Sequence, residues 1–153
     1  MVRVAEMSDA PLFWDWANDR EVRQNSWSSK EVELTSHLSW FKGKIESKDS
    51  RVYVLESEVG PVAQVRYDRT LCNEAEIDFS VSSKWRGQGV GTEALRLTKE
   101  DARVFLGVCR LFGIVKSNNF GSCKAFLKAS FVEGDQTEIK GQPCRTFYWP
   151  KSP

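Results

Sequence analysis

The chain has 153 residues, of which 41% are hydrophobic and 28% charged. This is the size and composition of one ordinary globular domain with a substantial core. The chain has 22 Lys and Arg residues against 21 Asp and Glu residues. It therefore lacks the basic surplus that is typical of a nucleic-acid-binding protein. No apolar run approaches the roughly 18–20 residues of a membrane span, and residues 1–6 lack the apolar block of a signal peptide. We expect one cytoplasmic domain over residues 1–153 that binds neither nucleic acid nor membrane.

The four cysteines are widely separated and form no C-x-x-C pair, and the one histidine is distant from all of them. Zinc sites usually take their ligands from closely spaced pairs, so we expect no metal site. We interpret the cysteines as reduced thiols of a cytosolic protein, with a disulfide framework as the alternative. The residues concerned are Cys72, Cys109, Cys123, Cys144 and His37.

The N-terminal third predicts one strand and two helices. Residues 1–6 alternate as a strand does, and an N-cap with a proline in the first turn at residues 8–11 predicts a helix over 12–17. Residues 18–26 are polar and predict an irregular segment. Residues 28–31 match a capping box, and an apolar stripe with spacings of four, three and four then predicts a second helix. The stripe comprises Leu34, Leu38, Phe41 and Ile45.

From Arg51 onward the apolar period changes to two, which predicts strands. Two of them flank a hairpin turn at residues 59–61, and the segments that follow alternate between strand and helix. This order is typical of an α/β (α+β) fold with a partly antiparallel sheet. The later segments are predicted strands at 75–81, 111–115 and 146–149 and predicted helices at 92–105 and 121–129.

A glycine-rich loop joins the strand at 75–81 to the long helix. The first N–H groups of a helix have no intrahelical acceptor, and glycine lets the backbone approach an anion closely. Arg86 and Lys84 add positive charge, and the Thr92 hydroxyl could reach a phosphate oxygen. The loop therefore predicts a phosphate site, the alternative being a tight turn that needs glycine for its shape alone.

The glycine spacing matches neither G-x-x-x-x-G-K-[ST] nor G-x-G-x-x-G. Arg86-x-x-Gly89-x-Gly91 resembles instead the pyrophosphate loop [QR]-x-x-G-x-[GA] of the GNAT N-acetyltransferase superfamily. Downstream, residues 115–131 resemble its later motif V-x-x-x-N-x-x-S-x-x-[AL]-[FY]-x-K-x-G-F. The matching positions are Asn119, Ser122, Phe126, Lys128 and Phe131.

The resemblance implies a mixed, mostly antiparallel sheet of about six to seven strands flanked by about four helices. It also implies that the strands at 75–81 and 111–115 splay apart, so that the pantetheine of acetyl-CoA inserts between them as a pseudo-strand. For Asn119 and Ser122 an N-cap and a buried helix face are the alternative roles. By resemblance the acetyl-CoA-binding residues are Phe79, Val81, Arg86, Gly87, Gln88, Gly89, Val90, Gly91, Thr92, Asn119, Ser122 and Phe126.

Acetyl transfer to an amine requires a base for the ammonium proton. Glu74, Glu76 and Asp78 share one strand face, where carboxylates raise one another's pKa. Glu76 is the first candidate and Asp78 the second, the alternative being an exposed acidic face. The superfamily's frequent general acid is a tyrosine where this chain has Phe126. Phenylalanine cannot protonate a thiolate, so the proton is expected from the substrate amine or from water.

Residues 16–23, 37–41 and 64–68 resemble the superfamily branch of ribosomal-protein and nucleotide-sugar N-acetyltransferases. They are most similar to enzymes that acetylate a 4-amino group on a UDP- or dTDP-linked deoxysugar in pseudaminic-acid-type pathways. Trp40 could instead pack in the core, His37 could be a partly exposed helix residue, and Arg66 could pair with a nearby acid. The candidate substrate-binding residues are Asn25, His37, Trp40, Gln64 and Arg66.

Three functions therefore remain open. The first is acetylation of a nucleotide-linked amino sugar by a monomer or homodimer. The second is acetylation of a protein N-terminus or an aminoglycoside, which an acidic rather than an arginine-lined groove would favour. The third is a non-catalytic acyl-CoA-binding module, which the absence of the tyrosine leaves open.

Overall fold

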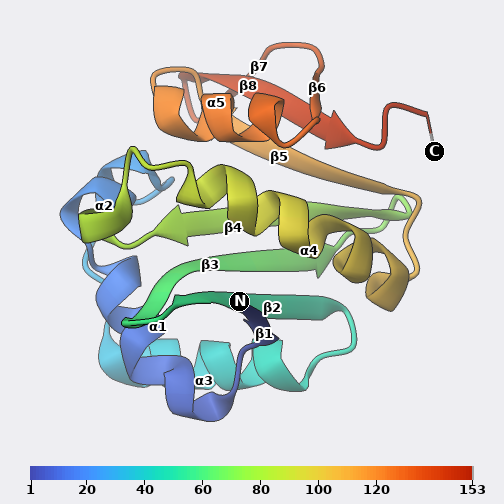
Figure 1. The fold of residues 1–153 in the computed structure, drawn as a ribbon. Coiled ribbons are helices and arrows are strands. Elements are labelled where there is room, and N and C mark those ends of the chain that lie inside the picture. Colours follow the sequence, from blue (N-terminus) through green and yellow to red (C-terminus); the bar gives the residue numbers. More distant parts are fainter. Residues whose placement is uncertain (153) are drawn as a thin grey trace.

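A computed structural model describes residues 1–152 of the chain (Figure 1). Within them an eight-stranded sheet runs in the order β1-β2-β3-β4-β5-β8-β6, with β7 paired to β8. Only β4 and β5 pair in parallel, so the expected mixed, mostly antiparallel sheet is confirmed. The strands are β1 (Val2–Val4), β2 (Ser50–Ser57), β3 (Gly60–Arg69), β4 (Glu74–Val81), β5 (Arg110–Lys116), β6 (Val132–Glu133), β7 (Thr137–Ile139) and β8 (Gln142–Trp149). The α-helices are α1 (Ala10–Ala17), α2 (Arg20–Asn25), α3 (Leu34–Glu46), α4 (Val90–Leu106) and α5 (Phe120–Lys128), and short 3-10 turns span Met7–Asp9 and Ser83–Trp85.

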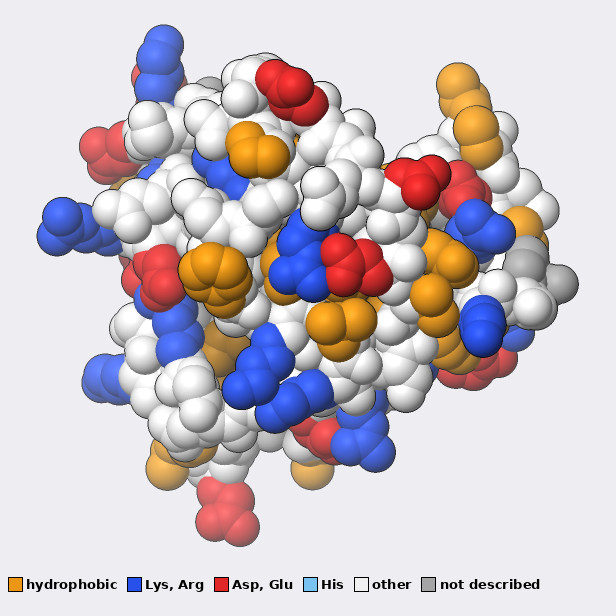
Figure 2. Space-filling model, turned by 90° about the horizontal axis from the view of Figure 1, so that it is seen from above, with side chains coloured by type: hydrophobic (Ala, Val, Ile, Leu, Met, Phe, Trp, Pro, Cys, Tyr) orange, Lys and Arg blue, Asp and Glu red, His pale blue; other side chains and the backbone are white. Residues whose placement is uncertain are grey.

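The sheet separates two hydrophobic cores because successive side chains of a strand point to opposite faces. On one face α1 and α3 pack Phe13 and Phe41 against Val52 and Val54 of β2. On the other face α4 and α5 cover a larger core that includes Tyr67 of β3. Full burial of each large side chain contributes about 1.5–3 kcal/mol, so both layers hold the sheet. Figure 2 shows acidic and basic side chains interspersed on the face seen from above, in keeping with a formal net charge of +1.

Two sequence predictions for the N-terminal third are wrong. The segment 18–26 contains α2, whose N-cap Asp19 accepts hydrogen bonds from the backbone N–H of Glu21 (3.0 Å) and Val22 (3.2 Å). The residues 28–31 form no capping box, because α3 starts later, at Leu34. The missed signal was the Asp19 N-cap, which a polar composition conceals. Strands β6 and β7 also went unpredicted, since both are short and depend on pairing with β8.

The predicted splay between two central strands is present. Strands β4 and β5 pair only at Glu74–Arg110, Ala75–Leu111 and Glu76–Phe112. Beyond Glu76, β4 stays paired with β3 and β5 with β8, and the two strands diverge. In Figure 1 they separate toward the left, and α2 lies at their open end. The β5-facing backbone edge of β4 therefore has no strand partner from Ile77 to Val81 within the described sheet, as the pseudo-strand expectation requires.

Arg3 and Asp9 form an ion pair that fixes the entry to α1, with N–O distances of 2.8 and 2.7 Å. The Arg3 guanidinium lowers the pKa of the Asp9 carboxyl below its ordinary value, and the Glu6 N–H adds to this against the opposing effect of burial. The stabilisation is therefore present above the unfolded pKa of about 3.9 and is lost as the pH falls through the lower folded value. We expect Asp9→Asn to destabilise the protein by about 1–2 kcal/mol near neutral pH. In urea unfolding the variant should also lose less stability than the parent on acidification, and equal losses would contradict this assignment.

Candidate active site

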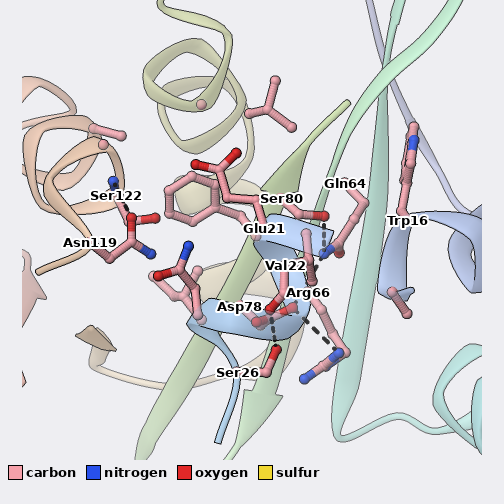
Figure 3. Close-up of a pocket in the computed structure, with 18 of the residues that line it drawn as sticks. Trp16, Glu21, Val22, Ser26, Gln64, Arg66, Asp78, Ser80, Asn119 and Ser122 are labelled. Carbon is pink, nitrogen blue, oxygen red and sulfur yellow. Dashed lines mark hydrogen bonds and ion pairs between the residues drawn. The ribbon is translucent and has the colours of Figure 1, made fainter. Parts of the chain in front are cut away.

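A cavity of about 900 Å³ crosses the open end of the splay. One side is formed by the glycine loop, the starts of α4 and α5 and the end of β5. The other side is formed by α1, α2, α3 and β3, with β4 between the two (Figure 3). The cavity thus joins the predicted donor-binding segments to the predicted acceptor-binding segments. The donor-side residues that line it include Phe79, Val81, Arg86, Gly87, Gly89, Val90, Gly91, Thr92, Asn119, Ser122 and Phe126, whereas Gln88 lies outside the described lining.

The glycine loop has the geometry of an anion cradle. Gly89 is the N-cap of α4 with φ at +80°, a left-handed conformation that disfavours side chains. A Cβ on Gly91 would lie 2.9 Å from Phe79 Cε2, so the start of the helix approaches β4 as closely as it can. The free N–H groups of α4 and the unpaired edge of β4 therefore suit a diphosphate followed by an extended pantetheine.

Arg86 lines the cavity, and its guanidinium pairs with acidic side chains. Its guanidinium contacts Asp19 Oδ1 and Glu21 Oε2 of the α2 segment, both at 2.7 Å. Both terminal nitrogens are thus engaged by carboxylates. The structure places Arg86 between the glycine loop and α2, and the backbone of the loop carries the phosphate-binding geometry.

The α5 residues fill structural roles as well as lining the cavity. Asn119 is the N-cap of α5 and accepts a hydrogen bond from the Ser122 N–H at 3.3 Å, which was the alternative considered for it. Phe126 is only 1% exposed and stacks on Phe147 with ring centroids 5.2 Å apart. Its ring therefore forms the aromatic floor of the cavity and belongs mainly to the core.

The polar face of β4 carries the carboxylate that opens into the cavity. Asp78 Oδ2 accepts a hydrogen bond from Gln64 Nε2 (3.2 Å) and lies 3.6 Å from Arg66 Nη1. The same Gln64 amide reaches Ser80 Oγ at 3.1 Å. Figure 3 shows Gln64, Asp78 and Ser80 grouped opposite Asn119 and Ser122. With 57% of its side chain exposed, Asp78 is held on one oxygen and accessible to a ligand.

Glu76 lies at the closed end of the splay, where β4 is still paired with β5, and is absent from the described cavity lining. Partial burial raises the pKa of the Glu76 carboxyl. The negative charges of Asp68 and Asp78 raise this pKa further, while the positive charge of Arg66 lowers it. The expectation that carboxylates on this face perturb one another holds for Glu76. Glu76 therefore lies next to the cavity lining along β4 and does not itself line the cavity.

The acceptor side combines tryptophan with paired charges. Arg66 lies over the Trp40 ring at 4.8 Å and pairs with Asp68 at 2.7 Å, so the alternative of an ion pair applies to it. His37 lines the cavity but is only 4% exposed, and its Nε2 lies 3.1 Å from the Ala10 carbonyl. Burial lowers the pKa of His37, so the neutral ring ties α3 to α1. The interpretation of His37 as a partly exposed helix residue is wrong.

Several lining residues were not predicted. Glu21 of α2 and Lys116 of β5 reach the cavity only because the fold brings these distant segments together. Lys44 of α3 also lines the cavity and pairs with Asp68 of β3 at 2.8 Å. The acidic pair flanking Arg20 was visible in the sequence, but its partner Arg86 is 67 residues away. Residues 1–152 contain no cluster of three or more His, Cys, Asp or Glu side chains suited to a metal ion. None of the helices described is long and apolar enough to cross a membrane.

The model of the acetyltransferase (GNAT) domain family matches residues 1–132, so the chain belongs to this family. A ribosomal-protein-alanine N-acetyltransferase from Brucella melitensis has a TM-score of 0.81 and 22% identity, covering 97% of this chain and 98% of that chain. A spermidine N-acetyltransferase from Vibrio cholerae with CoA and spermine has a TM-score of 0.83 and 15% identity, covering 97% and 93%. AAC(6')-Ib with ribostamycin and coenzyme A has a TM-score of 0.81 and 13% identity, covering 99% and 93%. No curated protein matches the chain in sequence.

The family match defines the chain as an acyltransferase, an N-acetyltransferase that uses acetyl-CoA as its co-substrate. The glycine loop and the splay of β4 and β5 fit that donor. The solved structures share the fold with this chain at low sequence identity. As their names state, these enzymes act on amines of different kinds.

Proposed function

We propose that this enzyme transfers the acetyl group of acetyl-CoA to the primary amine of a nucleotide-linked amino-deoxysugar. The supporting observation is the composition of the acceptor half of the cavity, where cations and tryptophans outnumber carboxylates. Guanidinium and ammonium groups suit a diphosphate, and indole rings suit a base or a sugar face. The residues concerned are Arg23, Lys44, Arg66, Trp16, Trp27 and Trp40, against Glu21 and Asp78.

The same composition argues against a cationic acceptor. Polyamines and aminoglycosides carry several positive charges and need walls of opposite sign. Here the two lining carboxylates are already matched, Glu21 by Arg86 and Asp78 by Arg66, while Asp68, which lies outside the described lining, pairs with Lys44 and Arg66. A peptide N-terminus carries one charge and stays the second candidate, supported by the ribosomal-protein enzyme that has the same fold.

Asp78 is the residue that we propose as the base. Acetyl-CoA supplies the acetyl group as a thioester. Asp78 accepts the ammonium proton, the amine nitrogen forms a bond to the acetyl carbon as the carbon–sulfur bond breaks, and CoA leaves as the thiol after protonation by water or by the amine. Gln64 Nε2 donates to Asp78 Oδ2, and Asp78 Oδ1 has no hydrogen-bond partner among the described residues.

We also propose a cytoplasmic location, since all four cysteines are free thiols in the structure and reducing compartments maintain that state.

The acceptor class is tested by measuring thiol release from acetyl-CoA with a panel of amines. The panel comprises UDP- and dTDP-linked 4-amino sugars, N-terminal peptides, aminoglycosides and spermidine. We expect turnover with one of the nucleotide sugars and little with the polycations. Efficient acetylation of peptides or aminoglycosides, without turnover of any nucleotide sugar, would contradict the proposed acceptor.

A further inference from the structure

Helix α2 forms part of the acceptor wall, yet no residue of this six-residue helix is buried. Val22, Arg23 and Asn25 all line the cavity. A helix this short is not stable alone in water, and packing of an apolar face usually supplies the missing stability. Polar contacts must therefore hold α2 in place.

The first of these contacts joins α2 to the glycine loop. Arg86 Nη2 lies 2.7 Å from Asp19 Oδ1, and Arg86 Nη1 lies 2.7 Å from Glu21 Oε2. Asp19 is also the N-cap of α2. The planar guanidinium offers these donors in a fixed fork, so it fixes the direction of the helix start as well as its position.

The second contact joins the other end of α2 to β5. Lys116 Nζ donates to the carbonyl oxygens of Ser26 (2.8 Å) and Gln24 (3.1 Å). A cation near the last carbonyls of a helix interacts favourably with them. The same ammonium lies 5.7 Å from the centre of the Trp27 ring, so it also positions the segment that follows α2.

Other contacts of this segment are internal to the N-terminal region. Arg23 Nε donates to the Ala17 carbonyl at 2.6 Å, and Arg23 Nη1 reaches the carbonyls of Ser28 and Lys30. These bonds give the segment its shape and move with it. The contacts to Arg86 and Lys116 differ from these. Arg86 lies in the glycine loop after β4 and Lys116 at the end of β5, and these two segments flank the space predicted to hold acetyl-CoA, which we call the donor cleft.

We propose that Arg86 and Lys116 are positioning residues for the acceptor, which transmit occupancy of the donor cleft to the acceptor wall through α2. Acetyl-CoA bound between the glycine loop and β5 fixes the spacing of the two anchors, so donor and acceptor strengthen each other's binding. Arg86 acts on the acceptor rather than on the diphosphate. This inference depends on the proposed function only in taking α2 as part of the acceptor site.

The test compares Arg86→Met and Lys116→Met with the parent enzyme. We expect each substitution to raise the KM of the acceptor amine about tenfold, a coupling of ordinary size, with CoA affinity by calorimetry changed less than about twofold. Arg86→Lys keeps the charge without the fork and should give an intermediate KM. Arg96→Met is the matched control, because Arg96 is an exposed cation of α4 whose one ion-pair partner among residues 1–152 is Glu93.

A second readout needs no acceptor. Amide hydrogen exchange over residues 19–27 should be faster in Arg86→Met and Lys116→Met than in the parent, and CoA should slow it in the parent but less in the variants. If no panel amine is turned over, the acceptor class fails while these exchange data still decide the role of the two anchors. An Arg86→Met variant that binds CoA about tenfold more weakly, with unchanged exchange in α2, would overturn the proposal and make Arg86 a phosphate ligand.

Discussion

Asp78→Asn is expected to lower kcat by about 100-fold or more, the usual contribution of a positioned general base. The amide keeps the size of the side chain and can still face Gln64 and Ser80, so the cavity should persist. It cannot take the ammonium proton. Steady-state thiol release with saturating acetyl-CoA, together with calorimetric CoA binding that stays within about twofold, measures the effect on chemistry alone.

Glu76→Gln is the matched control for this substitution. Glu76 is on the same face of β4, two residues away, but outside the described part of the cavity lining. Its pKa is raised mainly by partial burial of the carboxyl and then by the negative charges of Asp68 and Asp78. We expect its kcat near neutral pH to remain within about threefold of the parent. The opposite ranking, with Glu76→Gln inactive and Asp78→Asn active, would identify Glu76 as the base and overturn our assignment.

Gly113→Ala is expected to destabilise the fold by about 2–3 kcal/mol, at the upper end of overpacking effects. A Cβ at this position of β5 would lie 2.3 Å from Phe126 Cζ and 2.9 Å from two further ring atoms. The ring cannot retreat easily, since Phe79, Phe131 and Phe147 surround it at centroid distances of 5.1–5.4 Å. Thermal unfolding should show Tm lowered by about 5–10 °C for a domain of this size.

Two variants control this prediction. Gly43→Ala places a methyl group in α3 where nothing lies within 4 Å, and it should stabilise the protein by about 0.5–1 kcal/mol through helix propensity. Phe126→Leu removes the ring, so Gly113→Ala should cost much less in that background, which gives a coupling energy. Equal costs of Gly113→Ala in both backgrounds would show that the ring contact is not the cause.

The segments predicted to bind the donor could be placed from the sequence because their geometry is local. Gly89 and Gly91 sit in one loop that caps α4, and their spacing reflects backbone conformation within a few residues. The strand at 75–81 and the helix at 92–105 were found nearly at their observed bounds, because their apolar periods are regular. Ser122 and Asn119 likewise follow from one N-cap.

The acceptor side depended on pairing between distant segments. The alternation of β4 placed Glu76 and Asp78 on one face, but only the point where β4 leaves β5 decides which carboxylate opens into the cavity. Strand register is a long-range property that a single strand does not encode. The contacts of His37 and Arg66 could not be predicted for the same reason, since their partners Ala10 and Asp68 were known only once the helices and strands had packed.

The sequence by itself determined the glycine loop, the alternating faces of β4 and the family to which the chain belongs. Only the tertiary structure decided that Arg86 turns to α2. A guanidinium binds whichever carboxylates or phosphates the fold brings within reach, and Asp19 and Glu21 are more than 60 residues away in the chain. Local backbone conformation thus depends on residues that are close in the sequence, whereas the choice of charge partners depends on how the whole sheet assembles.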